Sequence, residues 1–200
     1  FFIEGASLFS NFGFGGANNY WSFNWGSPDL FYSRRIGRAP QGSLPSADFI
    51  DSPTGTRILG AGKITGKVGD NINIGMIHAI TSREFAEYQD VNHRDKIEIE
   101  PLTYYGVFRG QKEFDQGRQG FGFMSTYTTR KFSDNRLRDE LNANALSGGI
   151  DGWTFLDSDK MWVVTGWGAF TRVSGTPTKM LALQQSSQHY YQRSDVSHVH

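Results

Sequence analysis

Residues 57–80 alternate between apolar and polar positions with a period of two, which is typical of half-buried β-strands. One face of this stretch carries isoleucine, valine, methionine and glycine. The opposite face is mostly polar or small: its first half includes Arg57, Lys63 and Lys67, and its second half carries Asn71, Asn73, Gly75, Ile77 and Ala79. The pattern predicts one continuous apolar face, which contains Ile58, Ile64, Ile72, Ile74, Met76 and Ile80.

The middle of this stretch is Gly69-Asp70-Asn71, residue types that tolerate positive φ and favour tight turns. We therefore expect an antiparallel hairpin in which Val68 pairs with Ile72 and Ile64 pairs with Met76. A slip of one residue would turn Lys63 and Lys67 towards the apolar side, so the pairing is a sharp expectation.

Similar alternation along the rest of the chain predicts further strands. They cover residues 96–109, 117–130, 145–156, 160–173 and 179–192, and a short strand is expected over 29–35. Pro101 interrupts the first of them and indicates an edge, a bulge or two separate strands. Residues 82–95 are predicted to be a long polar loop, and residues 131–143 a loop with one or two helical turns.

The predicted strands are about 10 to 14 residues long, whereas strands of soluble proteins usually have about 5–6 residues. Transmembrane strands need about 9–11 residues. Short turns and longer polar loops resemble the asymmetry of outer-membrane barrels. We therefore predict an all-β fold, an antiparallel long-stranded meander over residues 56–200 that forms part of a transmembrane β-barrel. A soluble β-sandwich is the alternative.

Residues 1–55 show no sustained period and are rich in glycine, asparagine and aromatic residues. So many phenylalanine and tryptophan side chains would be unfavourable in water, so we expect them to pack against the strands. The segment is predicted to be irregular, and to serve as a linker that enters the barrel or as an internal plug.

The composition narrows the classes of function. The formal net charge is zero, which gives no electrostatic case for nucleic acid, and the chain has no cysteine. Glycine accounts for 24 of 200 residues and aromatic residues for 14%, a composition that favours β-structure. The sequence contains no run of about 18 apolar residues, so no transmembrane helix is predicted.

A cluster of cationic and aromatic residues is the best candidate ligand-binding site. Arg34, Arg35 and Arg38 lie close to Tyr32 in the sequence and could bind an anionic or sugar ligand. The alternative is that these arginines pair with acidic residues of the strands. Trp21, Trp25, Trp153, Trp162 and Trp167 are interpreted as core or interfacial residues, with sugar-stacking platforms as the alternative.

Catalytic chemistry finds little support in the sequence. No serine lies in a nucleophile-elbow motif. Glu98 and Glu100 share one face of a strand, as two glycosidase carboxylates could, but the simpler interpretation is a water-facing polar side. His198 and His200 have a spacing that suits zinc but no evident further ligands. We predict no catalytic residue, no metal and no cofactor.

Several blocks of the sequence resemble one uncharacterised family of large Gram-negative envelope proteins. The blocks are FFIEG at 1–5, LFYSRRIGRAP at 30–40, GAGKITGK at 60–67, IGMIHAIT at 74–81, EPLTYYGVFR at 100–109 and HYYQRSDVSHVH at 189–200. Members of this family carry a signal peptide and a domain similar to family-9 carbohydrate-binding modules. A long C-terminal region follows, which is believed to be an outer-membrane β-barrel.

The resemblance implies a location in the outer membrane and a channel, transport or anchoring role in glycan handling. Outer-membrane lipid, a glycan and an upstream carbohydrate-binding domain of the same chain are the implied partners. The 200 residues would form an incomplete barrel wall, as an internal piece of a longer chain. The alternatives are a soluble carbohydrate-binding β-sandwich and part of a glycan-directed hydrolase. Some members of the family are described as hydrolases, but no catalytic motif accompanies that description.

Overall fold

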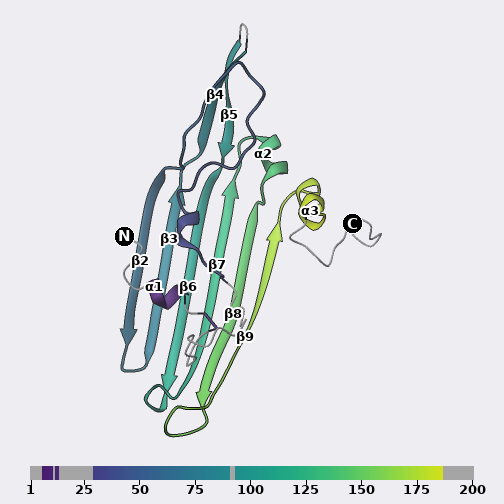
Figure 1. Ribbon diagram of the computed structural model, residues 1–200. Helices are drawn as coiled ribbons and strands as arrows, with labels where there is room; N and C mark the ends of the chain where they lie inside the picture. The colour runs from purple at the N-terminus through teal and green to yellow at the C-terminus, as the bar shows by residue number, and fades with distance from the viewer. Residues whose placement is uncertain (1–5, 11, 14–28, 91–92, 187–200) are drawn as a thin grey trace.

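The computed structural model describes residues 6–10, 12–13, 29–90 and 93–186, and its main feature is a long antiparallel sheet (Figure 1). Strands that lie side by side in this sheet also follow one another along the chain, so the sheet is a simple meander. The order is β2 (Ile58–Val68), β3 (Ile72–Thr81), β6 (Leu102–Phe114), β7 (Gln119–Lys131), β8 (Asn144–Phe155) and β9 (Val163–Ser174). Among the described residues, β2 and β9 pair on one side only, so the sheet is open.

A smaller sheet projects beyond one end of the large one (Figure 1). It contains β1 (Phe49–Asp51), β4 (Glu84–Asp90) and β5 (His93–Glu100), in the order β1-β4-β5. The expected loop over 82–95 was therefore wrong. Much of β4 and β5 is exposed, and few apolar residues are therefore present from which this hairpin could have been predicted. Pro101 divides β5 from β6, so of the three alternatives expected for this proline the structure shows two separate strands.

The helices are short. They are α1 (Ala6–Ser10), the 3-10 turns η1 (Ser33–Arg35) and η2 (Asp115–Gly117), α2 (Asn135–Glu140) and α3 (Pro177–Gln184). α2 confirms the predicted helical turns, but η1 replaces the strand expected over 29–35. α3 replaces the strand expected from 179, because Pro177 suits the first helical turn and the Thr176 hydroxyl accepts from the Lys179 amide at 3.3 Å.

The hairpin formed by β2 and β3 confirms the predicted register. Val68 pairs with Ile72 and Ile64 with Met76, and Gly69 has the positive φ of 61° that the turn requires. Ile58 is the exception. A β-bulge between Ile58 and Gly60 shifts the alternation, so Ile58 pairs with Thr81 and lies on the opposite face from Ile64.

The two faces of the large sheet have different chemistry. One face, here called the inner face, is covered in part by the described residues that precede β1, here called the N-terminal segment (Figure 1). The other, here called the outer face, carries apolar side chains that are each 39% to 66% exposed. These are Ile64, Val68, Phe108, Phe121, Phe123, Ile150, Val164 and Phe170.

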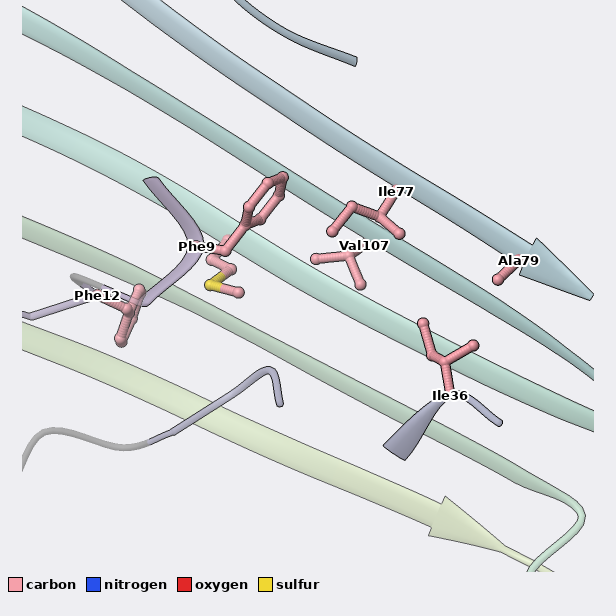
Figure 2. Close-up of a cluster of buried hydrophobic side chains, with 7 residues drawn as sticks. Phe9, Phe12, Ile36, Ile77, Ala79 and Val107 are labelled. Atoms are coloured by element: carbon pink, nitrogen blue, oxygen red, sulfur yellow. The ribbon is translucent and has the colours of Figure 1, made fainter. Parts of the chain in front are cut away.

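The hydrophobic core lies between the N-terminal segment and the inner face. Figure 2 shows Phe9, Phe12 and Ile36 of the segment over Ile77 and Val107 of the sheet. Ala79 and Met124 complete the cluster. This packing agrees with the prediction that the aromatics of the first 55 residues pack on strands, although Trp21 and Trp25 lie outside the described residues.

Candidate functional site

Polar side chains on the inner face form a continuous track from the short-turn end of the sheet to its middle. The Asn73 side-chain amide donates to Glu113 Oε1 at 3.2 Å, and the Gln111 amide donates to the same oxygen at 3.4 Å. Arg109 in turn donates to Gln111 Oε1 at 3.4 Å. Asn73, Gln111 and Glu113 are only half-buried, so this part of the inner face is open.

The track ends at a buried ion pair between Arg109 and Asp151. Arg109 Nη1 lies 2.6 Å from Asp151 Oδ1, and Nη2 lies 2.8 Å from Oδ2, which is a two-point contact. Both side chains are 1% exposed. Their strands are separated by β7, and the pair meets over Gly122. A Cβ there would lie 2.4 Å from Asp151 Oδ1, so glycine makes the room that the pair needs.

The N-terminal segment covers this ion pair with two consecutive residues. The backbone N–H of Gly13 donates to Asp151 Oδ2 at 2.9 Å, and the Arg109 guanidinium lies 5.4 Å from the centre of the Phe12 ring. Gly13 has a φ of 82°, which favours glycine, and it packs against Trp167. Thus the polar contacts, as well as the apolar core, fix the position of the segment.

A cavity of about 360 Å³ lies further along the inner face, beneath residues 29–36. Its apolar lining includes Phe31, Val107 and Val173, and its hydroxyl groups include Thr126 and Ser147, which hydrogen-bond each other at 2.6 Å. A partly enclosed, mostly apolar cavity with a few polar groups is typical of small-molecule sites.

The structure brings together only some of the predicted ligand-binding residues. Tyr32 and Arg35 line the cavity, whereas Arg34 and Arg38 do not. Arg34 and Arg35 are exposed, and neither side chain forms an ion pair with another described residue. Arg38 instead hydrogen-bonds the Gln41 side chain, and its carbonyl accepts from the Thr56 amide at 2.9 Å.

Glu98 and Glu100 are buried at 2% and 1% exposure, so the expectation of a water-facing polar side was wrong. Glu98 Oε1 accepts from Arg83 at 2.6 Å, and Oε2 accepts from the amides of Ser133 and Asp134 at 2.8 and 2.7 Å. Glu100 accepts from the Gln41 amide at 3.0 Å, and burial raises the pKa of its carboxyl group. Both carboxylates tie loops to β5, which leaves neither Glu98 oxygen free for acid–base chemistry.

These different surroundings predict unequal effects of a Glu→Gln substitution. We expect Glu98→Gln to lower the free energy of unfolding by about 1–3 kcal/mol. A glutamine side chain has only one acceptor oxygen, so it cannot accept hydrogen bonds at both positions, and it also loses the ion pair with Arg83. Glu100→Gln should cost less, since Gln keeps an acceptor for the Gln41 amide and removes a carboxylate that burial already disfavours. Denaturant unfolding of both variants is the measurement, and a larger loss for Glu100→Gln would contradict the assignment.

Within the part of the chain that the structure describes, neither a metal site nor a membrane-spanning helix is present. No group of three or more histidine or acidic side chains there could hold a metal ion. None of the described helices is long and apolar enough to cross a membrane. His198 and His200 lie outside the described residues.

The chain thus defines an all-β protein with an open antiparallel sheet, an exposed apolar face and a partly covered polar face. A family model described as "Domain of unknown function (DUF5916)" matches residues 1–151, so the chain belongs to that family. No curated protein and no solved structure matches the chain.

Proposed function

We propose that the six-stranded sheet is part of the wall of a transmembrane β-barrel in a Gram-negative outer membrane. The observation that carries this proposal is the outer face. Its apolar side chains are exposed over the whole sheet, whereas a soluble monomer rarely exposes an apolar patch larger than a few hundred Å². The outward-facing charges are Lys112, Lys131 and Arg172, which lie towards the strand ends.

The dimensions of the outer face support this proposal. On β6, the outward-facing Tyr104 and Phe114 are ten positions apart, about 33 Å along a strand that rises about 3.3 Å per residue. A strand tilt of about 40° would reduce this to about 25 Å, the height of the apolar band of outer-membrane barrels.

Aromatic residues border this apolar band, as the membrane–water interface favours. Towards the end that carries the small sheet, the Tyr104 hydroxyl and His78 Nδ1 are hydrogen-bonded at 2.6 Å, and the Tyr127 ring lies 6.5 Å from that of Tyr104. Towards the other end, Trp162 is 70% exposed. These side chains suit a position at the lipid headgroups.

The connections between strands differ at the two ends of the sheet. At one end the links are short: residues 69–71, 115–118 and 156–162. At the other end lie the small sheet, α2 and α3 (Figure 1). Outer-membrane barrels combine short periplasmic turns with long extracellular loops. This asymmetry supports an orientation in which β4 and β5 lie outside the cell.

The role of the chain in the membrane follows from the inner face. A polar track open to water suits the lumen of a channel or transporter, and the N-terminal segment lies on the inner face where a plug would lie. The link to glycans rests on the resemblance of the sequence to envelope proteins with a carbohydrate-binding domain. We propose a channel, transport or anchoring role in glycan handling.

Reconstitution tests the membrane part of this proposal. The chain should need detergent to stay in solution after refolding, and it should float with phospholipid vesicles through a density gradient and stay with them after an alkaline carbonate wash. Association with lipid follows from the apolar outer face. A monomer that stays soluble without detergent and does not float would contradict the proposal and favour a soluble β-sandwich.

A further inference from the structure

Within the described part of the chain, the buried Arg109–Asp151 pair leaves one hydrogen-bond donor of its guanidinium unpaired. Among the described residues, the Nε–H of Arg109 has no hydrogen-bond partner, and the whole side chain is only 1% exposed. A buried donor without an acceptor is unfavourable. The pair therefore has one donor left over, on a face where polar groups already converge.

The residues that now cover the pair show which chemistry it accepts. Gly13 supplies a hydrogen-bond donor to Asp151 Oδ2, and Phe12 lays an apolar ring over the Arg109 guanidinium. A ligand that takes their place would offer donors to a carboxylate, acceptors to a guanidinium and an apolar ring face. A sugar ring combines these three properties, because it has hydroxyl groups at its edge and C–H groups on its face.

The charge of the site favours an uncharged ligand. The formal charges of Arg109 and Asp151 sum to zero. An anion at the pair would be repelled by the Asp151 carboxylate, and a cation would be repelled by the Arg109 guanidinium. The neighbouring track adds an amide and a carboxylate at Gln111 and Glu113, which are hydrogen-bonding groups suited to hydroxyls. This track is half-exposed and leads from the open end of the inner face to the pair.

We propose that Arg109 and Asp151 form a binding site for uncharged polyhydroxyl solutes of the sugar class, and that Phe12 and Gly13 close it as an internal competitor. Solute binding and closure by the segment then exclude each other. This inference deepens the proposed glycan role and rests on it for the biological ligand, but the site itself can be tested in detergent, independently of membrane insertion.

A cysteine beneath the segment can report displacement, because the chain has no cysteine of its own. Met124 is fully buried in the hydrophobic cluster that also contains Phe9 and Phe12, so Met124→Cys should react slowly with a maleimide. We expect maltose to raise the labelling rate saturably, because it displaces the segment. Triethylene glycol at equal osmolality and glycine betaine are the control solutes and should leave the rate unchanged.

Two variants separate closure from ligand binding. In the Met124→Cys background, Phe12→Ala should raise the basal labelling rate at least about tenfold and lower the maltose concentration needed for half-saturation, because it weakens the competitor and leaves the pair intact. Asp151→Asn should raise the basal rate and abolish the response to maltose. Asp139→Asn, at an exposed acid in α2, is the matched control and should behave as the parent.

A labelling rate that maltose does not change, or changes only in proportion to osmolality, would overturn the sugar site. A maltose response that survives in Asp151→Asn would overturn it as well. Vesicle flotation is measured on the same protein, so failure of the site and failure of the membrane proposal are distinguishable. If Asp151→Asn does not fold, Phe12→Ala and the parent still decide the outcome.

Discussion

Asp151→Ala should lower the free energy of unfolding by about 3–5 kcal/mol, the range expected when one partner of a buried ion pair is removed. The substitution leaves the Arg109 guanidinium 1% exposed with no counter-charge and removes the acceptor of the Gly13 amide. The measurement is denaturant unfolding in the detergent or lipid in which the parent folds.

The double variant Arg109→Met with Asp151→Leu is the matched control. Replacing a whole buried pair with apolar residues of similar volume is often neutral or stabilising, so the double variant should recover most of the loss. Recovery would show that Asp151→Ala acts through the unpaired charge and not through lost packing. If Asp151→Ala costs less than about 1 kcal/mol, water reaches the pair and the closed arrangement under Phe12 is wrong.

The strands of the large sheet could be predicted because apolar and polar residues alternate with a period of two along most of them. The hairpin from Ile58 to Thr81 combines clean alternation with a turn that demands particular residues, and its register was correct. Ile58 was misplaced because a bulge leaves no clear trace in the alternation. The loop and strand errors at 82–95 and 179–192 have another cause. Exposed elements carry little periodic signal, and in α3 the capping residues at its start outweighed the apparent extended pattern.

The candidate site was harder to predict, because it depends on contacts between distant strands. Arg109 and Asp151 are 42 positions apart and meet across an intervening strand, above Gly122. The available signal was a charged residue at an inner position of each strand, Arg109 in β6 and Asp151 in β8, together with Gly122 between them. Local clustering instead pointed to Arg34, Arg35 and Arg38, of which only Arg35 lines the cavity.

The acidic residues of β5 illustrate the same limit. Period two placed Glu98 and Glu100 on one face, but period alone does not say whether that face meets water. The amides of Ser133, Asp134 and Gln41 come from segments far away in the sequence, and they make burial of both carboxylates possible.

Ile150→Arg should be the most informative substitution on the outer face. Ile150 is 50% exposed in the middle of β8, in the same row as Ile74 and Phe123. In water, such an exposed substitution changes the free energy of unfolding by about 0.5 kcal/mol or less. In a lipid bilayer, arginine near the midplane costs about 2–4 kcal/mol. We therefore expect a loss of about 2–4 kcal/mol for Ile150→Arg and for Ile74→Arg in phospholipid vesicles.

Thr65→Arg is the control for these variants, because Thr65 is exposed on the inner face of β2 and accepts the same new charge on the proposed water side. It should change the free energy of unfolding by about 0.5 kcal/mol or less, and Lys63→Ala on that face should also cost little. The measurement is equilibrium unfolding from vesicles by denaturant. The contrast depends on which side of the sheet meets lipid, since in water all three arginines would be tolerated alike. Equal and small effects at Ile150, Ile74 and Thr65 would therefore exclude a lipid-facing outer surface.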